Sequence, residues 1–171
     1  MAKKKPKKSR AAIGKKSRSK GQRGERAVVK ALTEWWGSEF ARTPSSGGFK
    51  TKQFRDEWNA ASDIVTSDET FPFGVEVKNC EGWHLEQLLT APKCDLYSWW
   101  AQTTDECPSK KIPLLVFTRN HQPLFCMMKH VDWTQEESEP SSSLLLNIPG
   151  KHQVLIIPAD TLFTTHKESW L

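Results

Sequence analysis

The sequence lacks long apolar stretches. Its uninterrupted apolar runs, such as those at residues 114–117 and 154–157, have the length of strands. They fall far short of the roughly 20 residues that a membrane-spanning helix requires. The basic N-terminus is not followed by an apolar segment, so it does not have the form of a secretory signal. These absences exclude a transmembrane helix, and we expect a cytoplasmic protein without a membrane partner.

Paired metal-binding side chains are also missing. The four cysteines form no CxxC pair and have no zinc-like spacing, which favours free thiols in a reducing compartment. The five histidines show no ligand spacing either, so we assign them no role. Nothing in the sequence therefore predicts a zinc centre or a disulfide framework.

Positive charge is concentrated at one end of the chain. Residues 1–30 hold 13 of the 25 Lys and Arg residues but only one of the 20 acidic residues, Glu25. A basic segment joined to an acidic body is typical of a protein that binds a polyanion such as DNA and uses carboxylates for another purpose, such as binding a cation. The alternative interpretation is a solubilising or nuclear-address tail.

The pattern of apolar residues predicts one α/β domain. Residues 1–20 lack apolar periodicity and are predicted to form a disordered basic arm, while residues 21–171 form the domain. Apolar steps of three and four residues predict a helix over residues 22–36 and another over 85–104, broken near Pro92. Short strands are expected at 40–42, 62–66, 73–78, 112–120, 123–129 and 153–157, with a helix after 159 and a polar loop at 136–143. This order favours a central mixed sheet flanked by helices.

Three acids and a lysine lie where a cation site could form. Glu25 falls on the apolar stripe of the first helix, where a carboxylate needs a partner or a cation. Asp63 begins a buried strand, and Glu76 and Lys78 share one face of the next, so hairpin pairing can bring them together. Two carboxylates held together repel, and a hard ion such as Mg²⁺ relieves that repulsion. Lys78 could orient the attacking water and offset charge that builds on a phosphate.

Each of these features also has a structural interpretation. Glu25 could be a first-turn acid that is favoured by the helix dipole and paired with Arg23 or Arg26. Glu76 and Lys78 could belong to the solvated, salt-bridged face of an amphipathic hairpin. The order of the features along the chain is more specific than any one of them.

That order resembles the signature of the PD-(D/E)XK nuclease superfamily. The signature has an acid on the opening helix, an acid followed by apolar residues, and an E-x-K on the next strand, which here are Glu25, Asp63-Ile64 and Glu76-Val77-Lys78. Flanking segments are similar to archaeal-type and phage Holliday-junction resolvases: KGQRGER at residues 20–26, RTPSSGG at residues 42–48, and Gln102 in the following helix. The resemblance covers about residues 20–117.

The resemblance implies a restriction-endonuclease-like fold and an endonuclease that cuts DNA at branch points as a homodimer, with Mg²⁺ or Mn²⁺ as cofactor. The implied metal ligands are Asp63, Glu76 and Glu25, and Lys78 would serve catalysis. The residues expected to contact DNA are Arg42, Ser46, Lys20, Arg23 and Arg26, and Gln102 would support the site. If the chain is phage-encoded, it would act in the cytoplasm of the bacterial host.

Two alternatives stay open beside the resolvase interpretation. In the first, the protein only binds or packages DNA through its basic arm, and its acids are structural. In the second, it is a less selective nuclease, such as a replication-fork or restriction-like enzyme on the same fold, because the same motif occurs in all these nucleases.

Overall fold

A seven-stranded mixed sheet forms the centre of the protein, in the order β1-β2-β3-β4-β5-β7-β6. The computed structural model describes residues 10–43, 62–91, 93–133, 140, 142–148 and 152–171. The strands are β1 (Phe40–Arg42), β2 (Ile64–Thr66), β3 (Phe73–Asn79), β4 (Ile112–Thr118), β5 (Phe125–Lys129), β6 (Leu144–Asn147) and β7 (Gln153–Pro158). The helices are α1 (Arg10–Trp36), α3 (Gln87–Thr90), α4 (Asp95–Glu106) and α5 (Ala159–Phe163), with 3-10 turns η1 (His130–Asp132) and η2 (Lys167–Trp170).

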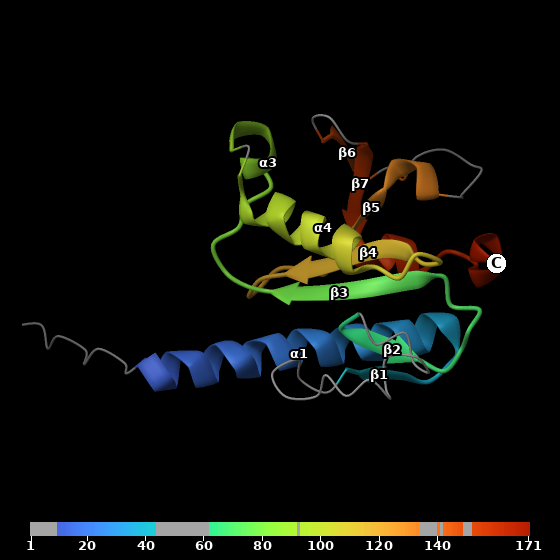
Figure 1. Ribbon diagram of the computed structural model, residues 1–171, viewed down its shortest axis with the longest axis horizontal. Helices are drawn as coiled ribbons and strands as arrows, with labels where there is room; N and C mark the ends of the chain where they lie inside the picture. The colour runs from blue at the N-terminus through green and yellow to red at the C-terminus, as the bar shows by residue number, and fades with distance from the viewer. Residues whose placement is uncertain (1–9, 44–61, 92, 134–139, 141, 149–151) are drawn as a thin grey trace, which may run out of the picture.

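Helices cover both faces of this sheet, as Figure 1 shows for α1 on one side and α4 on the other. The central strands β3 and β4 pair in parallel, while β2 pairs antiparallel with β3 and β5 antiparallel with β4. Both hairpins predicted from the sequence, β2–β3 and β4–β5, are therefore confirmed. The expected fold class, a mixed sheet flanked by helices, is confirmed as well.

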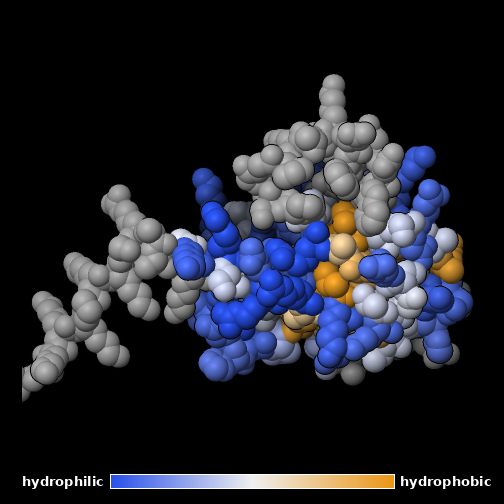
Figure 2. Space-filling view, turned by 90° about the horizontal axis from the view of Figure 1, so that it is seen from below, coloured by the Kyte–Doolittle hydropathy of each residue, from blue (hydrophilic) through white to orange (hydrophobic). Residues whose placement is uncertain are grey.

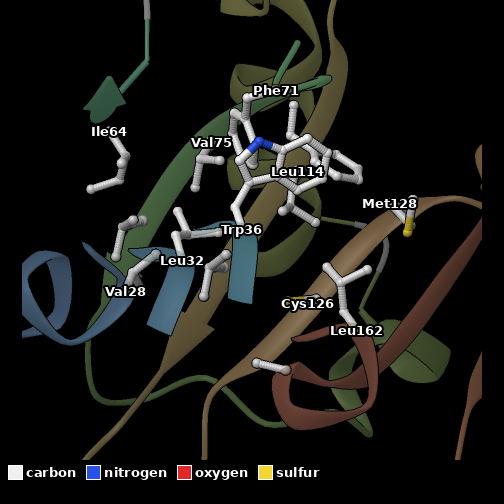
Figure 3. Close-up of a cluster of buried hydrophobic side chains, with 14 of the residues drawn as sticks. Val28, Leu32, Trp36, Ile64, Phe71, Val75, Leu114, Cys126, Met128 and Leu162 are labelled. Carbon is white, nitrogen blue, oxygen red and sulfur yellow. The ribbon is translucent and has the colours of Figure 1, made fainter. Parts of the chain in front are cut away.

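The alternation of side chains in β3 divides the interior into two layers. Val75 and Val77 are buried against α1 in one layer, and Figure 3 shows Val28, Leu32 and Trp36 of α1 packed there. The opposite layer holds the buried residues of α4 with side chains of β4 and β7. Because successive residues of a strand face opposite sides, Glu76 and Lys78 face the α4 layer. The strand thus carries its charged residues on the α4 side of the sheet.

Helix α1 is longer than the sequence predicts, because it begins at Arg10 rather than near residue 22. The helix therefore includes residues 10–20, which the sequence analysis placed in the basic arm. No proline interrupts this segment, and Ala, Lys and Arg extend a helix readily once its far end is anchored. Apolar periodicity marks only the part of a helix that packs on a core. Residues 1–9 lie outside the described residues.

The remaining elements agree with the expectations except at one edge of the sheet. The second helical region is divided into α3 and α4, as predicted, although Pro92 itself is outside the described residues. Edge strand β6, which pairs antiparallel with β7, was not predicted. Most of the predicted polar loop at 136–143 also lies outside the described residues. In the part of the chain that is described, no helix is long and apolar enough to cross a membrane.

Candidate active site

Asp63 and Glu76 meet where β2 joins β3. The antiparallel register pairs Ile64 with Val75, so Asp63, one residue before β2, lies beside Glu76. Asp63 is anchored twice to β3: its backbone N–H donates to the Val75 carbonyl oxygen at 3.0 Å, and its Oδ2 accepts from the Val77 amide at 2.9 Å. The Asp63 carboxylate thus takes the place of a backbone acceptor at this point of the ladder. The two acids that the sequence predicted to meet do so.

Lys78 lies between Glu76 and helix α4. Its ammonium Nζ donates to Oε1 of Glu76 at 2.6 Å and to Oε1 of Gln102 at 3.0 Å. Both members of the Glu76–Lys78 pair are largely shielded from solvent, with side chains 9% and 19% exposed. The sequence predicted these residues and Gln102 for one site, and the fold brings them together with Asp63. Their catalytic roles stay predictions.

The electrostatics of this site are unfavourable for two ionised carboxyl groups. Burial raises the pKa of Asp63, and the neighbouring Glu25 and Glu106 charges raise it further, while the Val77 amide and Lys78 lower it. Burial also raises the pKa of Glu76, with the Asp63 charge as the next cause, and Lys78 opposes both. One lysine thus faces several carboxylates. A site with this excess of negative charge gains from a bound cation.

The donor set fits a hard divalent cation. Carboxylate oxygens are the ligands that Mg²⁺ prefers, and Mg²⁺ uses one or two of them together with water and substrate phosphate oxygens. Within the described ranges, no three His, Cys, Asp or Glu side chains are gathered into a metal-binding cluster. Asp63 and Glu76 would therefore be the protein's contribution, and the rest of the coordination sphere would come from solvent and DNA.

Glu25 is paired with Arg42 rather than gathered with the other two acids. The Arg42 Nε donates to Oε2 of Glu25, and both side chains are about one-quarter exposed. The Glu25 charge still acts on Asp63, whose pKa it raises. The predicted metal contact of Glu25 and DNA contact of Arg42 stay predictions. Ser46, also expected to contact DNA, lies outside the described residues.

The basic residues of α1 divide into one that is packed and two that are exposed. Lys20 forms an ion pair with Glu81, its side chain is 14% exposed, and its backbone oxygen accepts from Nδ2 of Asn79 at 3.0 Å. Arg23 and Arg26 are exposed on the outer side of the helix. Figure 2 shows hydrophilic side chains gathered over the face of the molecule on the α1 side. The surface available to a polyanion therefore includes Arg23 and Arg26, whereas Lys20 joins α1 to the end of β3.

Two residues near the site escaped the sequence analysis. Glu106 lies in the last turn of α4. Each of its two carboxylate oxygens accepts from Nε2 of Gln102 at 3.3 Å. The four-residue spacing from Gln102 on one helix could have revealed it. Gly24 lies where α1 crosses β3, and a Cβ there would come within 2.7 Å of the Asn79 Cβ. A glycine inside a helical pattern was the available signal for this close approach.

Comparison with known protein families gives a match over most of the chain. The model of the family described as "Phage putative PDDEXK endonuclease" matches residues 16–169. No curated protein and no solved structure matches the chain significantly. The matched segment includes all the acids and the lysine of the site described above.

Proposed function

The chain belongs to the phage PDDEXK endonuclease family, and on that basis we propose that it hydrolyses DNA phosphodiester bonds with the help of a divalent cation held by Asp63 and Glu76. We propose Mg²⁺ as the cation, with Mn²⁺ as a substitute. The observation that carries this proposal is the pair of shielded carboxylates beside one lysine, with raised pKa values that a cation would restore to normal.

Each side chain of the site has a separate task in this proposal. When bound, the cation would supply Lewis-acid stabilisation of the negative charge that develops on the phosphate. The Val77 amide fixes the Asp63 carboxylate against β3, so this donor is aligned before DNA arrives. Lys78 would orient the attacking water and offset charge on the phosphate oxygens. Glu25 would assist as a further cation contact once Arg42, its present partner, turns towards DNA.

The basic helix α1 would hold the DNA. Arg23 and Arg26 are three positions apart, and Lys30 follows four positions later, so all three share one face of the helix. All three side chains are exposed. Contacts of this kind go to the phosphate backbone and carry no sequence information. Arg42 and Ser46 would act nearer the scissile phosphate, and we propose that Lys20 adds to the positive potential of the same helix.

We further propose that the preferred substrate is branched DNA and that a homodimer cuts it in the host cytoplasm. The support is the similarity of residues 20–26 and 42–48 and of Gln102 to resolvases. Two of these similar positions lie near the site. Gly24, in residues 20–26, allows α1 to approach Asn79 at the end of β3, and Gln102 accepts a hydrogen bond from Lys78. A four-way junction has two strands to cut symmetrically, which suits a two-fold dimer with one site per subunit.

Cleavage of an end-labelled four-way junction, compared with a linear duplex of the same arm sequence, tests this choice of substrate. Paired nicks on opposite strands near the branch, with little cutting of the duplex, would support a resolvase. Equal cleavage of both substrates would leave a nuclease of lower selectivity. Binding without cleavage under any divalent cation would favour the DNA-binding alternative. Sedimentation of the protein with and without the junction reports the proposed dimer separately.

A further inference from the structure

Four polar side chains form a continuous chain from β3 to the last turn of α4. Glu76 accepts from Lys78 at 2.6 Å, Lys78 donates to Oε1 of Gln102 at 3.0 Å, and Nε2 of Gln102 lies 3.3 Å from both oxygens of Glu106. The Gln102 side chain thus lies between the Lys78 ammonium group and the Glu106 carboxylate. The first three residues belong to the site already described, whereas Glu106 has no role in the proposed function.

The hydrogen-bonding capacities of these groups allow Gln102 only one orientation. An ammonium group can only donate, and an ionised carboxylate can only accept. The amide oxygen of Gln102 must therefore face Lys78, and its NH₂ group must face Glu106. Oxygen and nitrogen of an amide are otherwise interchangeable in shape, so the charged partners on its two sides decide which way it points.

We propose that Glu106 is a positioning residue, which holds the Gln102 amide with its oxygen towards Lys78 and so keeps the Lys78 ammonium beside Glu76. If the amide turned over, its NH₂ group would face the ammonium, donor against donor, and Lys78 would lose one of its two acceptors. The inference rests on the proposed function only in that Lys78 serves cleavage. The orientation of the amide itself does not depend on any activity.

The position of Glu106 makes it a suitable site for variants. It is exposed at the end of α4, so its replacement leaves no cavity and no unpaired buried charge. Asp105, its neighbour on the same helix, is also exposed and supplies a control with the same change of charge. Any effect of altered net charge on DNA binding will therefore occur at both positions. An effect confined to position 106 will report either the contact with Gln102 or the direct action of the Glu106 charge on the pKa of Asp63 and Glu76, and Glu106→Gln, which removes the charge but keeps an acceptor, separates the two.

Three substitutions separate the possible outcomes for cleavage. Glu106→Gln keeps an acceptor for the Gln102 NH₂ group and should retain near-normal kcat. Glu106→Ala removes the acceptor and should lower kcat by roughly fivefold to tenfold, the size of one ordinary hydrogen bond, because the contact is exposed to solvent, with little change in KM. Glu106→Lys offers only donors, favours the inverted amide and should lower kcat more than Ala does. Asp105→Ala and Asp105→Lys should leave kcat unchanged.

A double-mutant cycle tests whether Glu106 acts through Gln102. In a Gln102→Leu background, Glu106→Ala should have no further effect on kcat, because there is no amide left to orient. Full additivity of the two losses would overturn the proposal. Equal kcat for Glu106→Lys and wild type would overturn it too.

A second measurement needs neither DNA nor cation. In ¹H–¹⁵N spectra of the metal-free protein, the side-chain NH₂ signals that disappear in Gln102→Leu identify Gln102. We expect these signals to shift in Glu106→Ala and to stay in place in Asp105→Ala. Signals that do not move in Glu106→Ala would contradict the positioning role. A protein that passes this test but cleaves no DNA would instead refute the proposed function, so the two failures are distinguishable.

Discussion

The Asp63 carboxylate accepts a hydrogen bond from the Val77 amide at 2.9 Å and is thereby fixed to the strand that carries Glu76 and Lys78. The bond replaces a regular ladder bond at the point where β2 begins. It holds an acid from one strand beside the acid and the lysine of the next. This is the alignment that the proposed cation site requires.

Asp63→Asn should abolish cleavage while the fold stays intact. Asparagine keeps a carbonyl oxygen for the Val77 amide but removes the negative charge that a cation needs, so we expect a loss on the order of a thousandfold in kcat/KM. DNA affinity should hardly change, because no phosphate contact is removed. Single-turnover cleavage and a binding assay measure the two effects. Glu76→Gln should show the same loss of cleavage with unchanged DNA affinity. If either variant cleaves DNA at the wild-type rate, the substituted residue is not part of the cation site.

The same substitution should stabilise the metal-free protein at neutral pH. Burial and neighbouring charge raise the pKa of Asp63 above 3.8 and that of Glu76 above 4.5, so the folded state binds these protons more tightly than the unfolded state. Their contribution to stability is therefore largest at low pH and falls as the pH rises through the raised pKa values. We expect Asp63→Asn to have the higher Tm at pH 7, with a difference that narrows on acidification.

Thermal unfolding followed by circular dichroism from pH 4 to pH 8 measures this difference. Addition of Mg²⁺ should raise the Tm of the wild type, because the cation binds the folded state, and should leave Asp63→Asn nearly unchanged. A lower Tm for Asp63→Asn than for the wild type in metal-free buffer at pH 7 would contradict this prediction, because it would show that the ionised Asp63 carboxylate stabilises the fold.

Replacement of Lys78 tests the charge balance of the site. Lys78→Met removes the ammonium group that pairs with the nearly buried Glu76 carboxylate. The free energy of unfolding should fall by about 3 kcal/mol, somewhat less if water reaches the site. Cleavage should fall as well, because the ammonium group of Lys78 is proposed to offset charge on the phosphate. The double variant Lys78→Met/Glu76→Gln should recover most of the stability and none of the activity. Denaturant titration checks the recovery, and two additive stability losses would contradict the pairing.

Gly24→Ala should disturb the contact of α1 with β3. The added Cβ would lie 2.7 Å from the Asn79 Cβ, so the helix must shift, at a cost of about 1–3 kcal/mol that exceeds the gain in helix propensity. Gly14→Ala is the matched control in the same helix, because its Cβ meets nothing within 4 Å, and it should stabilise the protein. Tm values of the two variants give the comparison. Equal gains in stability would show that the contact is loose.

Arg23→Ala and Arg26→Ala should weaken DNA binding through lost phosphate contacts. Each exposed arginine that contacts a phosphate should reduce the slope of log affinity against log salt concentration by about one unit. The effect should be equal for junction and duplex, since phosphate contacts carry no sequence or branch information. Binding titrations at several salt concentrations measure the slope. An unchanged slope in the double variant would place the DNA on another surface.

The sequence revealed the parts of this protein that repeat with a regular period or match a known motif. Alternation in residues 73–78 predicted that Glu76 and Lys78 share a face, and the apolar residues after Asp63 predicted the hairpin that places Asp63 beside them. Edge strand β6 was missed because three consecutive leucines show no alternation. The start of α1 was missed because residues 10–20 show no apolar periodicity, which is the signal from which a helix is predicted.

The partners of individual side chains could not be predicted in the same way. Glu25 was expected to need a partner, but Arg42 lies on another element and is distant in sequence. Lys20 looked like a free DNA contact, yet the packing of α1 on β3 brings it to Glu81. Such pairings depend on how elements cross, which no local pattern records.

Cleavage of an end-labelled four-way junction by wild type and Asp63→Asn, each with Mg²⁺ and with chelator, tests the central claim most directly. We expect paired nicks near the branch only for the wild type with Mg²⁺, and junction binding by both proteins in all conditions. Cleavage that persists with chelator or in Asp63→Asn would contradict a cation site at Asp63 and Glu76.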